Sequence, residues 1–172
     1  MYETKYPKPL IVIHWLTFIL LIIIYYIGFT LEDYEFNEAN MNRYRLHAIL
    51  GVTVLILTLI RIFVRRKNMN RLPPPISYYN NWHKQLVSIV HYLIYVFLIF
   101  APLVGFVMIY QTGALSYDLG GPFPSNAEFD HTLAEIHEFA VFSLLVLIIM
   151  HIAGVIIYRI KTGEDILDRM LP

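Results

Sequence analysis

The chain has 172 residues, of which 58% are hydrophobic, and its mean hydropathy is +0.57. Ordinary soluble domains contain about 45–50% apolar residues, so this composition favours a membrane protein. The sequence has no cysteine, which excludes disulfides, thiolate zinc sites, iron–sulfur clusters and covalently attached haem. The formal net charge is zero, which gives no indication of a nucleic-acid partner.

Four long apolar stretches predict four membrane-spanning helices, because a span needs about 20 mostly apolar residues. Pro7 and Pro9 mark the start of the first stretch. No small-residue cleavage site accompanies it, so we expect a retained span and not a signal peptide. Pro102 lies inside the third stretch, where we expect a kink. The sequence therefore predicts a single all-α domain over residues 1–172, an up-down-up-down four-helix bundle in the lipid bilayer, with helices at about 9–31, 43–64, 82–110 and 132–159.

Lysine and arginine are distributed unevenly between the two sides of this bundle. We assign 11 of them to the side that holds the chain ends, whereas only Arg43 and Arg45 fall on the other side. Cytoplasmic loops carry the excess of positive charge in membrane proteins, so we expect both termini in the cytoplasm. The opposite, outer loops are net acidic.

Histidines within the spans are the strongest candidates for function, because ionisable side chains are costly inside a membrane. His151 follows His137 by 14 residues, which on a helix is four turns less about 40°, so both side chains point to the same side. Along the helix axis the two residues are about 21 Å apart. Matching these two by depth with the histidines near the ends of the first and second spans gives an inner pair and an outer pair, each suited to bind the iron of one haem b from both sides. The inner pair is His14 with His151, and the outer pair is His47 with His137.

Residues at the same two depths on the other helices predict space and charge for a cofactor. Gly28 is level with the outer pair, and Gly51 lies one turn after His47, so both are expected to leave room for a flat macrocycle. Arg61 lies 14 residues after His47, toward the cytoplasm, where we expect it to pair with a haem propionate. Arg43, one turn before His47, is the corresponding candidate on the outer side.

Other interpretations of the polar side chains stay open. A membrane histidine can simply hydrogen-bond a neighbouring helix, and a zinc site is disfavoured because zinc ligands cluster at one depth. His91 is compatible with a core hydrogen bond, a contact to a ligand histidine or a quinone, or haem ligation. We expect His83 to anchor the chain at the interface and His131 to be solvated. Tyr158, seven residues after His151, suits either a quinone pocket or the aromatic belt of a membrane protein.

Short motifs surround these histidines and close the chain. They are Ile13-His14-Trp15, Leu46-His47-Ala48-Ile49-Leu50-Gly51, His91-Tyr92-Leu93-Ile94-Tyr95, Pro102-Leu103-Val104-Gly105, Ile136-His137-Glu138, His151 and Leu167-Asp168-Arg169-Met170-Leu171-Pro172. Together they resemble the bacterial cytochrome b-561 family over essentially the whole chain. The resemblance implies a multi-pass inner-membrane protein with two haem b groups and a ubiquinone contact near Tyr158. It also implies that the iron ligands are His14, His47, His137 and His151.

Two electron-transfer functions follow from this resemblance. The first is a superoxide oxidase, in which superoxide at the periplasmic face is the electron donor and ubiquinone is the acceptor, without a catalytic acid–base side chain in the first step. The alternative is a haem-b membrane anchor that relays electrons between quinone and a periplasmic dehydrogenase partner. The acidic outer loops suit a basic protein better than an anion, because a positive funnel would steer superoxide. A third, non-redox interpretation is a structural bundle with satisfied core histidines.

Overall fold

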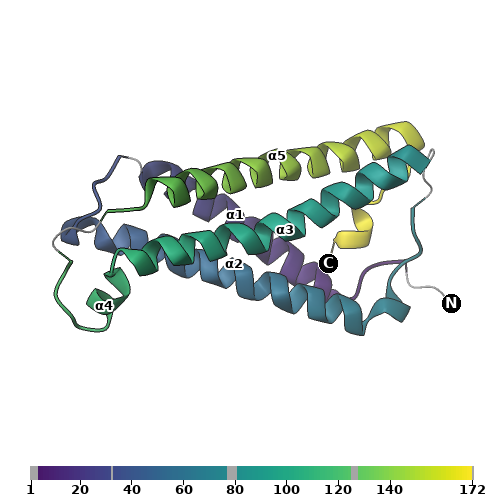
Figure 1. Cartoon of the computed structure of the whole chain (residues 1–172). Coiled ribbons are helices and arrows are strands. Elements are labelled where there is room, and N and C mark those ends of the chain that lie inside the picture. Colours follow the sequence, from purple (N-terminus) through teal and green to yellow (C-terminus); the bar gives the residue numbers. More distant parts are fainter. Residues whose placement is uncertain (1–3, 32, 77–80, 125–127, 172) are drawn as a thin grey trace.

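A computed structural model of the chain describes residues 4–31, 33–76, 81–124 and 128–171. Four long helices dominate it, and each is long and apolar enough to cross a membrane. They are α1 (Lys8–Leu31), α2 (Met41–Lys67), α3 (Asn81–Gln111) and α5 (His131–Thr162). Consecutive long helices run in opposite directions, and both chain ends lie at the same end of the bundle (Figure 1). The predicted all-α, four-span architecture is confirmed.

The connections and helix ends follow ordinary capping chemistry. In the described part of the chain, four short elements connect or follow the long helices: α4 (Ala114–Asp118) and the 3-10 turns η1 (Glu38–Asn40), η2 (Met69–Arg71) and η3 (Asp168–Met170). Asp130 caps the start of α5 by accepting a hydrogen bond from the Leu133 N–H at 2.9 Å. Gly163, with φ of 72°, ends the same helix in the left-handed conformation that favours glycine. We call the end with both chain ends the terminal end, and the end with α4 the loop end.

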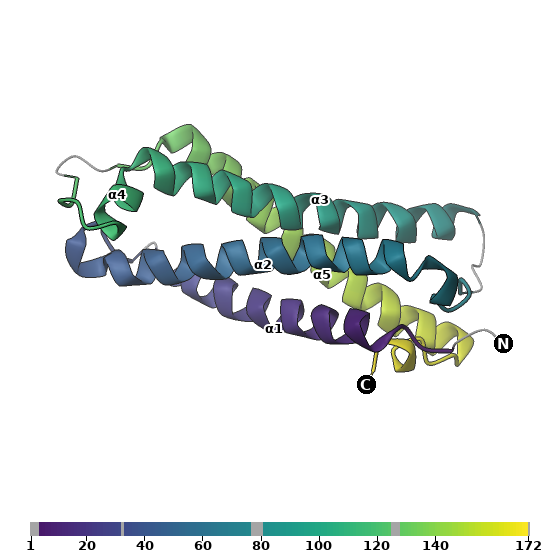
Figure 2. The same cartoon turned by 90° about the horizontal axis from the view of Figure 1, so that it is seen from below.

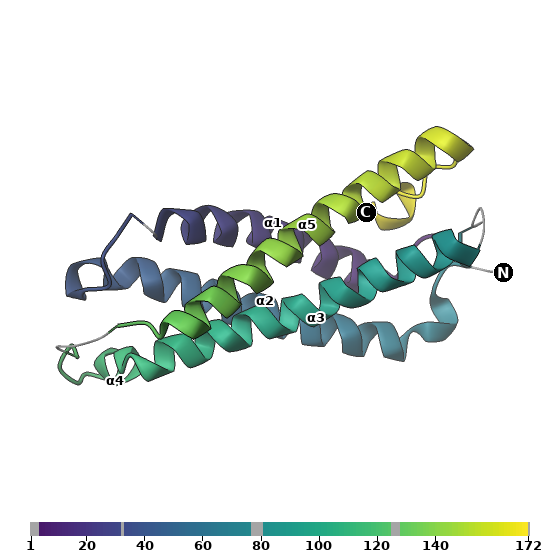
Figure 3. The same ribbon diagram turned by 45° about the horizontal axis from the view of Figure 1, so that its top comes forward.

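Helix packing follows the order of the chain. α1 packs on α2, α2 on α3 and α3 on α5. Within the described part of the chain, α5 makes no comparable backbone contact with α1 or α2. α5 crosses the bundle obliquely, so that its start lies beside the end of α3 and its end lies toward the start of α1 (Figures 2 and 3). Side chains and not close backbone packing therefore connect α5 to α1 and α2.

An aliphatic layer fills the middle of the bundle. It consists of one nearly fully buried side chain from each long helix: Leu21, Val54, Leu98 and Leu144. The Tyr25 hydroxyl packs beside this layer and donates a hydrogen bond to the carbonyl of Val141 at 2.7 Å, which joins α1 to α5. In lipid, such contacts stabilise a bundle by packing and hydrogen bonding more than by exclusion of water.

The outer surface of the long helices is apolar. At most 22% of the apolar window in any span is buried within the protein. Phe29, Phe63, Tyr92 and Phe139 are each more than three-fifths exposed. Helices satisfy their own backbone hydrogen bonds, so such a surface is stable against hydrocarbon. The exposed apolar belt therefore indicates contact with lipid around the whole bundle.

Candidate functional site

At the loop end, His47 of α2 and His137 of α5 face each other. Their ring centroids are 6.3 Å apart, and the ring planes meet at 74°. Nδ1 of His137 lies 3.0 Å from the carbonyl oxygen of Ala101 in α3. Because a carbonyl only accepts, we assign the ring proton to Nδ1, which leaves the lone pair on Nε2. A neutral imidazole with a free ring nitrogen is the form that binds a metal.

Two glycines make room for these rings. A Cβ atom added to Gly28 of α1 would lie 3.1 Å from Cε1 of His47. One added to Gly105 of α3 would lie 3.1 Å from Cε1 of His137. Each glycine therefore lets a helix backbone approach an imidazole more closely than a side chain would permit. Gly51, in contrast, faces an aliphatic side chain of α1 at an ordinary contact distance of 3.7 Å.

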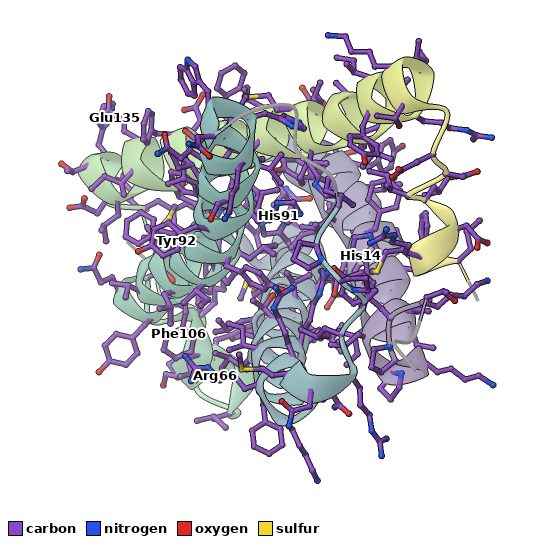
Figure 4. The ribbon with its side chains drawn as sticks, turned by 90° about the vertical axis from the view of Figure 1, so that its right-hand side faces the viewer. His14, Arg66, His91, Tyr92, Phe106 and Glu135 are labelled. Atoms are coloured by element: carbon purple, nitrogen blue, oxygen red, sulfur yellow. The ribbon has the colours of Figure 1, made fainter. Side chains whose placement is uncertain are left out.

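At the terminal end, His14 of α1 and His151 of α5 form the second pair. Their ring centroids are 6.4 Å apart, with planes at 76°. His91 of α3 lies still closer to His151, at 4.8 Å and 86°. Its Nδ1 is 2.7 Å from the carbonyl oxygen of Val87, so its proton is also assigned to Nδ1. Seen from the terminal end, His14 and His91 lie toward the middle of the bundle, whereas Tyr92 points outward (Figure 4). His91 thus makes both a helix hydrogen bond and a contact to a candidate ligand.

The two arginines that we expected near cofactor edges lie at opposite ends of α2. The guanidinium carbon of Arg61 is 5.8 Å from the ring centroid of Tyr95, at the terminal end of α2. Arg43 lies over the ring of Tyr34 at 3.9 Å, a cation–π contact at the loop end. Each arginine therefore lies at the same end of the bundle as one histidine pair and contacts a tyrosine ring there.

Tyr158 differs from an ordinary belt tyrosine. It lies near the terminal end of α5 and is only 2% exposed. Its hydroxyl donates a hydrogen bond to the Glu164 carboxylate at 2.8 Å, and its ring stacks on His83 at 6.4 Å between centroids. His131, in contrast, is exposed and lies 3.6 Å from the Glu135 carboxylate. A buried phenol and an imidazole thus share the terminal end with the His14–His151 pair.

These side chains fall into three layers, seven residues apart in each long helix. The terminal-end layer is His14, Arg61, His91 and His151, and the loop-end layer is Gly28, His47, Gly105 and His137. The aliphatic layer lies midway between them. Sequence reasoning found the 14-residue step but missed the middle layer. A seven-residue step is almost two helical turns, so a search for that repeat would have revealed it.

Comparison with known proteins decides the family. Residues 5–172 match the profile of the family described as prokaryotic cytochrome b561. The chain belongs to the prokaryotic cytochrome b561 family. A probable superoxide oxidase CybB of Yersinia pestis is 25% identical over 172 residues, which cover 98% of this chain and 96% of the relative. Cytochrome b561 homolog 1 of Escherichia coli strain K12 is 23% identical over 176 residues, which cover 98% of this chain and 97% of the relative.

As a cytochrome b561, this chain is a multi-pass bacterial membrane protein that binds haem b and transfers electrons across the membrane. Haem b supplies one-electron redox chemistry when it is bound. The histidines suit such a group. Among the described residues no cluster of three or more His, Cys, Asp or Glu side chains could hold a metal ion by itself, and each histidine pair would supply two imidazoles to one. If two imidazoles each bound one metal at about 2 Å from opposite sides, their ring centroids would be roughly 6 Å apart. The ring centroids in the two pairs are 6.4 and 6.3 Å apart, which is close to that distance.

Proposed function

We propose that this cytochrome b561 holds two haem b groups, one in each histidine pair. The axial ligands would be His14 and His151 at the terminal end, and His47 and His137 at the loop end. The observation that carries this proposal is that both pairs face each other across helices that do not pack closely, at 6.4 and 6.3 Å between ring centroids. Histidine on both faces of an iron leaves no open position, which suits electron transfer better than oxygen binding. Arg61 would neutralise a propionate at the terminal end.

We propose that electrons enter at the loop end, on the periplasmic side, and reach ubiquinone at the terminal end, on the cytoplasmic side. The excess of lysine and arginine at the terminal end supports this orientation in the inner membrane. Superoxide is the proposed donor, supported by the name of the Yersinia pestis relative. Two superoxide anions would be oxidised to two molecules of dioxygen, and one ubiquinone would take up the two electrons and two protons to form a quinol.

The surroundings of Tyr158 support a quinone contact at the terminal end. The buried hydroxyl is joined to Glu164, a carboxylate on an exposed residue beyond the end of α5. A hydroxyl and a carboxylate in contact can pass protons between the surface and a bound headgroup. His83, stacked on the same phenol, adds a second ionisable group. We therefore propose Tyr158 as the residue that contacts the quinone.

A protein donor is the second candidate, and one observation favours it. Arg43 lies over Tyr34, and Nε of Arg45 donates to the Asp118 carboxylate at 3.1 Å. Asp118 therefore compensates the charge of Arg45, whereas Arg43 lies over a neutral ring and keeps its charge. Steering of an anion needs uncompensated positive charge, and one of the two loop-end arginines no longer supplies it. An acidic loop end would instead attract a basic periplasmic protein, such as a dehydrogenase subunit that delivers electrons.

The donor is tested by stopped-flow absorbance of the purified, oxidised protein. We expect a superoxide pulse to reduce the haem rapidly, superoxide dismutase to abolish the reduction, and ubiquinone to reoxidise the haem. A red protein that ignores superoxide would refute this donor and favour a protein partner. A protein that stays colourless when haem is supplied would refute the haem proposal itself.

The ligand assignment is tested by removing one imidazole from each pair. His151→Ala should lose only the terminal-end haem, and His137→Ala only the loop-end haem, because each change leaves the other pair intact. Haem per protein and redox difference spectra measure both losses. His131→Ala is the matched control, since that histidine is exposed and outside both pairs. Full haem content in His151→Ala would show that another side chain is the ligand.

A further inference from the structure

The last residues of the chain fold back across the terminal end of the bundle. We call residues 164–171 the C-terminal clasp. Its first part is bound to the end of α5 from which it emerges. Tyr158 donates to Glu164 at 2.8 Å, and a guanidinium nitrogen of Arg159 lies 3.2 Å from the carboxylate of Asp165. The clasp therefore leaves α5 in a defined direction.

The second part of the clasp is bound to α1 and the residues before it. The backbone N–H of Tyr6 donates to the carbonyl of Arg169 at 3.0 Å. The indole N–H of Trp15 donates to the carbonyl of Met170 at 2.6 Å. These two bonds attach consecutive carbonyls of the clasp to the start of α1.

A third segment joins the same contact. The Arg169 guanidinium donates to the carbonyl of Pro74, in the connection between α2 and α3, at 2.8 Å. Lys5 and Asp168 form an ion pair at 3.3 Å, but both side chains are substantially exposed, so this pair contributes little. The hydrogen bonds to backbone carbonyls are thus the main attachment of the clasp.

Trp15 connects the clasp to the candidate haem site. It follows His14 directly, and the two rings meet edge to face with centroids 5.5 Å apart. α1 and α5 do not pack closely through their backbones, although His14 must face His151 across that seam. Together with side-chain contacts and with the Tyr25–Val141 bond near the middle of the bundle, the clasp connects these two helices at the terminal end.

We propose that the C-terminal clasp sets the spacing of α1 and α5 at the terminal end and so holds His14 opposite His151, with Trp15 as a positioning residue. The haem readout of this inference rests on the proposed ligand pair. The helix spacing does not, and it is measurable without reference to haem.

Spacing is measured with nitroxide labels and pulsed electron paramagnetic resonance, because the chain has no native cysteine to interfere. Val12→Cys with Ile160→Cys reports the terminal end, at positions 62% and 78% exposed. Phe29→Cys with Phe139→Cys reports the loop end, at positions 61% and 67% exposed. In a chain shortened after Gly163, we expect the terminal-end distances to shift and broaden and the loop-end distances to stay unchanged. Unchanged terminal-end distances, or equal broadening at both ends, would overturn the proposal.

The positioning role of Trp15 is measured in the full chain. Trp15→Phe keeps an aromatic ring and removes the N–H donor, so terminal-end haem should be retained about fivefold less well than loop-end haem, as expected for one lost hydrogen bond. The electron paramagnetic resonance signal of the ferric haem that remains at the terminal end should also change its position in the spectrum. Trp82→Phe, 70% exposed at the same end, is the control and should change neither.

The outcomes test separately whether the clasp sets the helix spacing and whether that spacing positions His14 and His151. Parallel loss of both haems in Trp15→Phe would mean a general stabilising role and overturn the positioning role. Shifted helix distances in the shortened chain with an unchanged haem ratio would confirm the clasp and overturn the assignment of His14 and His151 as its target pair.

Discussion

At the scale of single residues, backbone carbonyls determine which nitrogen of two imidazoles is free. The Ala101 carbonyl is bonded to His137, and the Val87 carbonyl is bonded to His91. Such a bond fixes the orientation of a ligand ring and makes its other nitrogen more basic. For His137 this supports axial ligation. For His91 it leaves an acceptor beside His151, suited to receive the second ring N–H of that ligand.

Alanine at either loop-end glycine should weaken haem binding at that end alone. The new methyl group of Gly105→Ala or Gly28→Ala would lie 3.1 Å from an imidazole, so the ring must move from its present position. We expect partial loss of loop-end haem with the terminal-end haem retained. Haem per protein and redox difference spectra distinguish the two sites.

Gly154→Ala on α5 is the matched control for these variants. Nothing lies within 4 Å of a Cβ atom added there, so both haems should be retained. Replacing a helical glycine by alanine should also stabilise α5 by up to about 1 kcal/mol. Full haem in both Gly28→Ala and Gly105→Ala would show that those glycines do not protect the pair.

The depth of the four histidines could be predicted, because a 14-residue step fixes both depth and face on a helix. The residues that contact the glycines could not be predicted, because they depend on how one helix is rotated about its axis relative to its neighbour. Gly28 was expected to clear space for a macrocycle, and the structure places it against the His47 ring. The contact between His91 and His151 could not be predicted either, because it depends on the angle at which α3 crosses α5, and the spacing of residues in the sequence does not determine that angle.

At the scale of elements, α4 closes the loop end by binding the start of α2 and η1. Arg45 donates to the Asp118 carboxylate, and the Tyr117 hydroxyl donates to Glu38 at 2.9 Å. No helix was predicted here from the sequence. A five-residue helix is too short for a hydrophobic period, and it follows Gly113, whose φ of 76° reads as a turn signal.

Asp118→Asn should separate the two proposed donors. It would release the charge of Arg45, so reduction by superoxide should become a few times faster at low ionic strength and lose that gain as salt is added. Reduction by a basic protein should instead become slower, because an acidic contact is removed. Stopped-flow rates over a series of salt concentrations measure both effects.

Asp168→Asn is the control for this experiment, because it removes the same charge at the terminal end. It should leave both rates unchanged. If superoxide reduces Asp118→Asn and the unaltered protein equally fast at every salt concentration, Arg45 does not steer the donor.

At the scale of the whole molecule, composition and hydropathy were enough to predict four spans and their alternating directions. The oblique course of α5 was not predictable, because helices in lipid are apolar on every side and carry no stripe that marks a partner. The terminal motif was noticed only through a family resemblance. Its contact with Trp15 joins residues 155 positions apart, which local patterns cannot indicate.

The aliphatic layer in the middle of the bundle has an electrical consequence. Leu21, Val54, Leu98 and Leu144 offer neither donors nor acceptors, so these four side chains cannot support a chain of water molecules that conducts protons. Electrons need no such chain. Under the proposed direction of transfer, negative charge would move inward across this insulator while protons are consumed on the cytoplasmic side. Each turnover would then charge the membrane like a capacitor, inside negative, and the rate would fall as the opposing voltage grows.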